Sequence, residues 1–307
     1  MKKNYSGCWP TMITPFTEEG KIDYKAVDNL VKWYIKRGCD GIFSVCQSSE
    51  MFYLSEREKL DLATATKEAA EGKVKVIASG HTADDHNKQI EELGKMAETG
   101  VDAVVLVSNR LAKENEGEDV FRANANDIFT QLPDVTFGLY ECPYPYLRLL
   151  TTDFLADCAK SGKLVFLKDV SCSTSILKER IEAIKGTSLS LFNANTSTLL
   201  DSFEMGADGY NGVMANFHID LYKWLYLNFK KEPETARELM DFLTLAGVIE
   251  ARCYPVSAKY HQNKFDVNMS VFTKAKDVNL LNENGIHELD ALHSMEVRWR
   301  KRLGLAL

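Results

Sequence analysis

The feature that most constrains the fold of this chain is a repeated alternation between short apolar runs and longer amphipathic segments. Several runs are apolar throughout, which is typical of parallel strands covered on both faces. Successive runs begin roughly 20 to 35 residues apart, the spacing of consecutive strand–helix units. The eight runs are residues 11–16, 41–45, 74–79, 103–108, 135–140, 164–168, 188–192 and 207–211.

The segments between these runs predict helices with recognisable ends. Asp23 is a typical N-cap before an apolar stripe with helical spacing, and Gly38 marks its end. Ser55 and Glu58 have the spacing of a capping box. Because no Gly-rich phosphate fingerprint follows a strand, the pattern favours a closed barrel over a Rossmann sheet. The expected fold is therefore α/β, a (β/α)8 TIM barrel with a C-terminal helical extension.

Two regions follow from this pattern. Residues 1–225 are expected to form the barrel, which carries the catalytic site, and residues 226–307 a helical extension packed on it. Helix-like stretches in the extension cover residues 234–251, 254–261 and 285–303. Since no low-complexity or Pro/Gly/Ser-rich linker separates the two regions, we do not expect the extension to be an independent domain.

Composition excludes several classes of function. Lys and Arg number 37 against 44 Asp and Glu, a net charge of −7 that argues against binding nucleic acid. No apolar stretch approaches the ~18 residues of a membrane span, and no apolar signal segment follows the first lysines. We therefore expect a cytoplasmic protein. The seven cysteines contain no CxxC pair, and His81 and His86 lack helical ligand spacing, so we expect no metal and no cofactor.

In such a barrel the chemistry lies at the C-terminal ends of the strands. Lys168 closes the run 164–167, and strand alternation places it on the same inward face as Phe166. Desolvation there lowers the pKa of an amine, and a neutral amine is what attack on a carbonyl requires. A lysine at a strand end can also extend its ammonium into solvent, so Lys168 alone leaves both interpretations open.

Tyr140 ends the preceding strand, and neighbouring strands lie ~5 Å apart. Its phenol is therefore suited to relay protons to and from the Lys168 amine. Ser48 and Ser49 lie where the second strand becomes a loop, and their amides and hydroxyls suit a carboxylate. Further polar residues follow the strand ends and are candidates for binding substrate: Gln47, Arg110, Asn193, Asn195 and Asn211.

Several motifs, in order and at matching spacing, resemble the dihydrodipicolinate synthase and N-acetylneuraminate lyase family of class I Schiff-base aldolases. The similarity covers roughly residues 7 to 225. CQSSE at 46–50 stands where the family has GTTGE, YECP at 140–143 resembles YNxP, and KDVS at 168–171 resembles KDSS. ITPF at 13–16 and GADG at 206–209 resemble the first strand and the eighth strand–helix turn.

The resemblance implies roles for individual residues. Lys168 would form an imine with a 2-oxo acid, typically pyruvate, and Tyr140 would be the acid/base phenol. Ser48 matches a hydroxyl residue of the loop that binds the keto-acid carboxylate, with Gln47 beside it. Asn211 matches a position whose backbone carbonyl lines the pocket. The resemblance also implies a homo-oligomer, a dimer or a tetramer.

The departures from the family pattern concern substrate choice. Gln47 replaces a hydroxyl of the proton relay, and Ser108 to Leu111 stand where the synthases have a tyrosine pair. Pro145 stands where the synthases have an arginine, and Thr196 and Ser197 where the sialic-acid lyases have acidic residues. The sequence therefore supports neither named activity.

The leading hypothesis is a carbon–carbon lyase that acts on a 2-oxo acid through a Lys168 imine and releases or uses pyruvate. Arg110, with Asn193 and Asn195, suits an acidic polyhydroxy substrate derived from a sugar acid. Arg110 can equally lie on the solvated rim. Two alternatives stay open: a hydro-lyase acting on a 2-keto-3-deoxy sugar acid through the same imine, and a barrel that binds a keto acid without turning it over.

Overall fold

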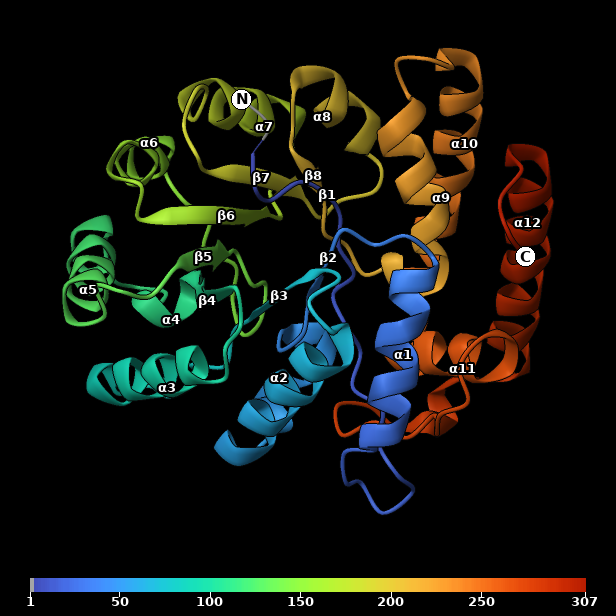
Figure 1. Cartoon of the computed structure of the whole chain (residues 1–307), viewed down its shortest axis with the longest axis horizontal. Helices are drawn as coiled ribbons and strands as arrows, with labels where there is room; N and C mark the ends of the chain where they lie inside the picture. Colours follow the sequence, from blue (N-terminus) through green and yellow to red (C-terminus); the bar gives the residue numbers. More distant parts are fainter. Residues whose placement is uncertain (1–2) are drawn as a thin grey trace.

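Eight parallel strands and the helices between them form the barrel of the computed structural model, which describes residues 3–307 (Figure 1). This confirms the expected TIM barrel with C-terminal helices. The strands are β1 (Gly7–Cys8), β2 (Gly41–Phe43), β3 (Lys75–Ala78), β4 (Ala103–Val107), β5 (Phe137–Tyr140), β6 (Leu164–Asp169), β7 (Ser190–Asn193) and β8 (Gly209–Tyr210).

The sheet order is β1-β8-β7-β6-β5-β4-β3-β2, and every neighbouring pair is parallel. The segment after β1 closes the circle against β2. The Met12 amide donates to the Phe43 carbonyl at 2.9 Å, and the Phe43 amide donates to the Pro10 carbonyl at 3.0 Å.

The first strand was expected at residues 11–16, and that expectation is wrong. The strand is Gly7–Cys8, and the later run forms only isolated bridges at Thr11 and Phe16. Pro10 directly precedes this run, and Pro15 lies within it. A proline has no amide hydrogen and so cannot donate to a strand ladder, which explains the break.

The helices of the barrel cover the outside of the sheet. Asp23 caps α1 by accepting from the Ala26 amide, and Ser55 and Glu58 form the expected capping box of α2. The helices are α1 (Tyr24–Lys36), α2 (Glu56–Ala70), α3 (His86–Glu98), α4 (Ser108–Leu111), α5 (Glu118–Gln131), α6 (Thr152–Ser161), α7 (Thr174–Ala183), α8 (Leu199–Met205) and α9 (Ala215–Asn228), with short 3₁₀ turns η1 (Gln47–Ser49) and η2 (Met51–Tyr53).

The C-terminal extension lies beside α9 and α1, as the orange and red segments of Figure 1 show. It contains α10 (Pro233–Ala246), η3 (Gly247–Ala251), α11 (Val256–Phe265), η4 (Val278–Leu280) and α12 (Glu283–Leu303), close to the expected stretches. The boundary expected after residue 225 falls within α9, which ends at Asn228. Among residues 3–307, no helix combines the length and the apolar character needed to cross a bilayer.

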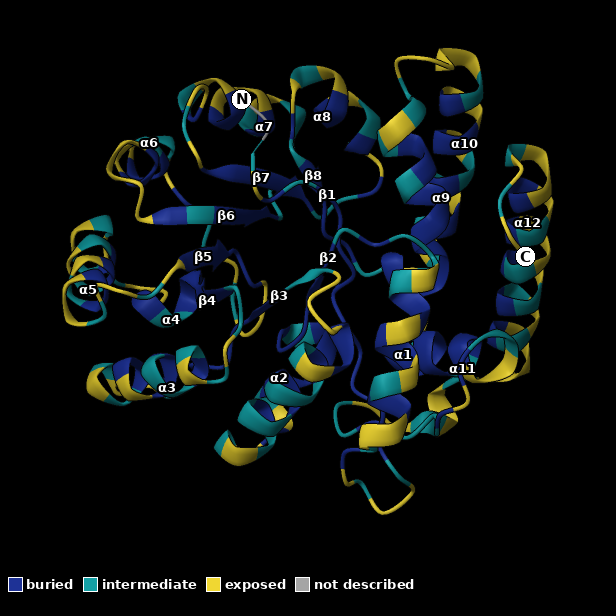
Figure 2. Cartoon of the chain, in the orientation of Figure 1, coloured by how far each residue is buried: buried dark blue, intermediate teal, exposed yellow. Residues whose placement is uncertain are grey.

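Aromatic side chains fill the interior of the barrel, where Figure 2 shows the strands almost wholly buried. Trp9 meets Phe192 edge to face at 5.5 Å between ring centroids, and Phe166 lies 4.6 Å from Phe192. Phe43 meets Phe166 at 6.3 Å. Since Phe166 precedes Lys168 by two positions on β6, this aromatic cluster forms the apolar floor beneath the lysine.

A buried ion cluster fixes the C-terminal ends of β5 and β6. The Arg180 guanidinium on α7 binds the carboxylates of Glu141 and Asp169, and all three side chains are at most 1% exposed. Glu141 also accepts from the amides of Leu150 at 2.8 Å and Val170 at 3.1 Å. Arg180 therefore holds together the two residues that directly follow Tyr140 and Lys168.

Replacing Arg180 should be strongly destabilising, because it leaves two buried carboxylates without their cation. We expect Arg180→Met to lower the free energy of unfolding by about 3–5 kcal/mol. Arg57→Met is the control: this arginine forms an ion pair with Asp61, but its side chain is 83% exposed, and an exposed pair is worth less than about 1 kcal/mol. Urea denaturation measures the free energy of unfolding of both variants. Equal losses in the two variants would contradict this role of Arg180.

Candidate active site

A cavity of about 480 Å³ opens at the C-terminal ends of the barrel strands. Its walls come from β5, β6, the turns after β2 and β7, and the C-terminal extension. The side chains that bear on chemistry are those of Gln47, Ser48, Tyr140, Lys168, Asn195, Glu250, Tyr254 and Lys276.

Lys168 lies in the cavity wall beside Tyr140, because β5 and β6 pair in the register that makes these two residues partners. The lysine is 4% exposed, and its Nζ lies 4.4 Å from the centre of the Tyr140 ring. Burial lowers the pKa of its amine, although the Cys46 and Cys142 thiols and the Glu250 carboxyl oppose the shift. The amine is therefore uncharged at lower pH than an exposed lysine, as a carbonyl nucleophile must be.

Tyr140 directs its phenol to the turn after β2, where the hydroxyl donates to Gln47 Oε1 at 3.1 Å. Burial raises the pKa of this phenol well above its ordinary value, so it is protonated at neutral pH. An amide oxygen accepts a hydrogen bond but does not take up and pass on a proton near neutral pH. The hydroxyl relay implied by the family pattern therefore stops at Gln47.

The two serines of η1 face different ways. Ser48 lines the cavity, and its hydroxyl donates to Thr11 Oγ1 at 3.1 Å. Ser49 is not among the lining residues: its hydroxyl donates to the Met12 carbonyl at 2.7 Å, and its carbonyl accepts from Thr14 at 2.8 Å. Ser48 is thus placed to meet a substrate, whereas Ser49 holds the turn against the first barrel segment.

Besides Ser49, three residues expected to bind substrate do not line the cavity. Arg110 donates to Asp84 at 3.0 Å, with its guanidinium 5.9 Å from the Phe52 ring centre, because the chain turns into α4 directly after β4. Asn193 donates to Thr198 at 3.0 Å, and the Asn211 side chain donates to the Trp9 carbonyl at 2.8 Å. A cation other than Arg110 is therefore needed to bind a distal acidic group of the substrate.

Asn195 does line the cavity, after β7. Its backbone is fixed by a 2.8 Å hydrogen bond from its amide to Asn193 Oδ1. Asn193 thus supports the loop that carries Asn195, so only one of the two asparagines is available to a substrate.

Three side chains of the C-terminal extension also line the cavity: Glu250, Tyr254 and Lys276. The sequence analysis did not predict them, because it considered only residues at the ends of strands. The Glu250 residue is exposed at the rim, but the surrounding cavity wall desolvates its carboxyl and raises its pKa to about 7, and the charge of Lys168 opposes this shift. The Tyr254 phenol accepts from Asn216 Nδ2 at 3.1 Å and lies beside the Ser48 and Thr11 hydroxyls. No strand precedes these residues, so nothing in their local pattern points to the cavity.

Within the described residues, the cavity wall contains no group of three metal-ligating side chains; the one such group in residues 3–307 lies in the extension. The cavity combines a desolvated amine, a protonated phenol on the next strand and a turn with hydroxyl and amide groups. On a TIM barrel, this arrangement defines an enzyme that forms a lysine Schiff base with a carbonyl substrate.

Comparison with known proteins agrees with this class. The model of the dihydrodipicolinate synthetase family matches residues 4–276, so the chain belongs to that family. It is accordingly a Schiff-base lyase, a pyruvate-dependent class I aldolase, which disfavours the alternative of a barrel without turnover.

Individual relatives are distant. The chain is 23% identical over 271 residues to the 4-hydroxy-tetrahydrodipicolinate synthase of Clostridium tetani, covering 86% of this chain and 89% of the relative. It is 25% identical over 221 residues to the N-acetylneuraminate lyase of Mediterraneibacter gnavus, covering 72% and 69%. A prophage protein of the dihydrodipicolinic acid synthase family from E. coli K12, solved in complex with pyruvate, superposes with a TM-score of 0.83 at 19% identity, covering 99% of this chain and 100% of that one.

The raised pKa of Glu250 makes a testable prediction about stability. Between pH values near 4.5 and near 7, the folded chain retains a proton on Glu250 that the unfolded chain has released. Stability therefore falls as the pH rises through this window. Glu250→Gln removes the ionisation, so the variant should gain stability relative to the natural chain between about pH 5 and about pH 8.

Urea denaturation at both pH values measures this difference. Glu204→Gln is the control, since Glu204 on α8 is exposed like Glu250 but is not part of the cavity wall. Identical pH dependence in the natural chain and the Glu250 variant would show that the carboxyl is solvated like any surface glutamate.

Proposed function

We propose that the chain is a class I aldolase that cleaves or forms a carbon–carbon bond of a 2-oxo acid through an imine on Lys168, with pyruvate as the released or consumed fragment. The observation that carries this proposal is the pairing of Lys168 and Tyr140 across β5 and β6, in the wall of the cavity and above an apolar floor. Membership of the family supports the same chemistry.

The reaction begins when the neutral Lys168 amine attacks the ketone carbon. The protonated Tyr140 phenol donates to the oxygen that becomes the carbinolamine hydroxyl, and the phenolate then takes the proton that the attacking nitrogen releases. The phenol donates this proton to the hydroxyl, which leaves as water and gives the protonated imine. The Ser48 hydroxyl and the backbone of the Gln47–Ser49 turn hold the adjacent carboxylate. Because the Gln47 amide ends the hydrogen-bond chain from Tyr140, the phenol exchanges protons directly with the attacking nitrogen and the departing oxygen, without a hydroxyl relay.

In the cleavage direction a base removes the proton of the C4 hydroxyl. The C3–C4 bond then breaks, its electron pair moves into the imine as an enamine, and an aldehyde leaves. Protonation at C3 and hydrolysis of the imine release pyruvate and restore the amine. Glu250, with a pKa of about 7, is the group in the cavity wall suited to take and return this proton near neutral pH.

We propose a sugar-acid-derived 2-oxo acid as the substrate. The Asn195 amide and the Glu250 carboxyl suit hydroxyl groups, and Lys276 at the rim supplies the cation for a distal acidic group that Arg110 was expected to supply. Dehydration of a 2-keto-3-deoxy sugar acid is the second candidate, because a carboxyl with a pKa of about 7 can also protonate a leaving hydroxyl.

We further propose that the chain acts in the cytoplasm as a homo-oligomer, a dimer or a tetramer. The resemblance of the barrel motifs to those of the family supports this proposal. Light scattering of the purified chain measures the number of copies.

The imine makes a direct prediction. Borohydride added with pyruvate should reduce the imine and leave a stable adduct on Lys168, which mass spectrometry locates. Lys168→Ala should lose both the adduct and turnover, whereas Lys163→Ala should retain both, because Lys163 is exposed and directly precedes the same strand. An adduct on another lysine, or none on the natural chain, refutes the assignment.

The substrate proposal is tested with a panel of 2-keto-3-deoxy sugar acids. We expect turnover of at least one acid with a distal carboxylate or phosphate, and little or none of N-acetylneuraminate or of pyruvate with aspartate semialdehyde. Lys276→Met should raise KM for the acidic substrate and leave the borohydride adduct with pyruvate unchanged, since Lys276 lies at the rim.

Product analysis separates the two candidates, because cleavage yields pyruvate and an aldehyde whereas dehydration yields a single 2-oxo acid and water. Robust activity with aspartate semialdehyde refutes the substrate proposal and leaves the Lys168 imine standing.

A further inference from the structure

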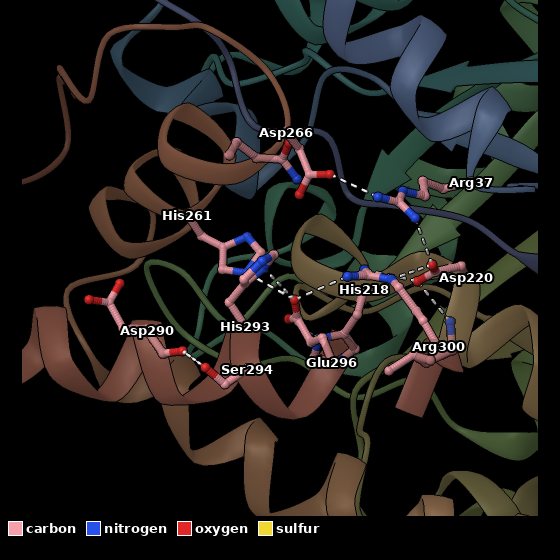
Figure 3. A network of polar contacts seen from close by, with 12 residues as sticks. Arg37, His218, Asp220, His261, Asp266, Asp290, His293, Ser294, Glu296 and Arg300 are labelled. Carbon is pink, nitrogen blue, oxygen red and sulfur yellow. Dashed lines mark hydrogen bonds and ion pairs between the residues drawn. The ribbon is translucent and has the colours of Figure 1, made fainter. Parts of the chain in front are cut away.

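The junction between the barrel and its C-terminal extension contains three histidines around one carboxylate (Figure 3). Glu296 on α12 lies with Oε1 2.9 Å from Nδ1 of His218 on α9. Its Oε2 lies 3.1 Å from Nε2 of His261 on α11 and 3.5 Å from Nδ1 of His293 on α12. Glu296, His218 and His261 are completely buried, and the His293 side chain is 26% exposed.

The charges around this cluster do not balance. Arg300 binds Asp220 with both Nε and Nη2, at 2.7 and 3.2 Å, and Arg37 bridges Asp220 and Asp266 at 3.3 and 3.0 Å. These two guanidinium groups neutralise the two aspartates. Arg300 also lies 3.5 Å from Glu296 Oε2, but its charge is already matched by Asp220. Glu296 is therefore a buried carboxylate without a cation of its own when the imidazoles are neutral.

We propose that His261, His293 and Glu296 bind a divalent transition-metal ion, with Zn²⁺ the best fit. One nitrogen or oxygen atom from each lies within 4.8 Å of the others, and two imidazoles with one carboxylate are a ligand set that Zn²⁺ accepts at about 2.0–2.2 Å. This site is separate from the proposed function, because none of its residues lines the active-site cavity.

The local geometry suits ligation. His293 and Glu296 are three residues apart on α12, which places both on one helix face. The His293 ring stacks on Phe265 with centroids 3.7 Å apart and planes 1° from parallel, so its Nδ1 is held toward the carboxylate. This buried Nδ1 has no hydrogen-bond partner in residues 3–307. His218 holds the other carboxylate oxygen, as residues behind a metal ligand commonly do.

Three protein ligands leave a fourth tetrahedral position for water. Because the His293 side chain is partly exposed, the ion can reach the site from solvent along this side chain. A bound ion would supply the missing positive charge and would tie α11 to α12. Because it binds the folded chain and needs this junction intact, it should raise the thermal unfolding midpoint in proportion to the logarithm of its concentration.

The test uses the full chain, stripped of metal with a chelator. Added Zn²⁺ should bind with one ion per chain in a calorimetric titration and raise the unfolding midpoint, and added Co²⁺ should develop the visible absorption of a tetrahedral nitrogen–oxygen site. His293→Gln should weaken Zn²⁺ binding at least tenfold. The matched control is His287→Gln, an exposed histidine on the same helix, which should bind like the natural chain.

Zn²⁺ binding that is absent, or equally strong in the two variants, overturns the proposal. If circular dichroism shows that His293→Gln does not fold, chemical modification of the natural chain tests the proposed Zn²⁺ site instead. Zn²⁺ should protect His293 from diethyl pyrocarbonate while His287 reacts at its usual rate, and equal reaction of both with and without the ion refutes the site.

Discussion

The buried ion cluster of Arg180, Glu141 and Asp169 is the interaction on which the geometry of the candidate site depends. Glu141 directly follows Tyr140, and Asp169 directly follows Lys168. Since side chains alternate along a strand, binding both acids to one arginine outside the barrel turns the phenol and the amine toward its interior. Burial raises the pKa of Glu141, against the opposing charge of Arg180. Burying these charges is costly in desolvation free energy, but the ion cluster fixes the register between β5 and β6.

The C-terminal extension is joined to the active site through Glu50. This residue follows η1 with a left-handed φ of 63°, and its buried carboxylate pairs with Lys259 of α11 at 2.7 Å. It also accepts from the Ala275 amide at 2.8 Å. The same turn that carries Ser48 therefore anchors the segment that brings Lys276 to the cavity. Turn and extension form one wall, although more than two hundred residues separate them in the sequence.

The sequence predicts those parts of the protein that depend on local pattern. Strand alternation is sufficient to place Lys168 inward, and the strand spacing places Tyr140 beside it. The first strand expected at residues 11–16 was wrong because an apolar pattern does not record the missing amide hydrogens of Pro10, before the run, and Pro15, within it. The expectation that Arg110 binds substrate failed for a related reason: a strand end identifies where a residue lies but not where a long side chain points.

Glu250 and Tyr254 were beyond sequence reasoning because their positions depend on how the extension packs. The grouping of His261 with His293 was missed for the same reason, since the ligands of α11 and α12 become neighbours only when these helices pack together. Contacts of this kind are set by tertiary structure, and the sequence of either helix alone carries no sign of them.

The aromatic floor beneath Lys168 has a consequence for how this enzyme can change. Trp9, Phe166 and Phe192 seal the barrel from below, so substrate, product and the water of imine formation all pass through the mouth. Glu250, Tyr254, Pro255, Ala275 and Lys276 line that mouth from the C-terminal extension, which does not carry the lysine that forms the imine. Substitutions around Lys276 can therefore change which substrates the enzyme accepts while Lys168 and Tyr140 stay in place, so substrate choice can evolve separately from imine formation.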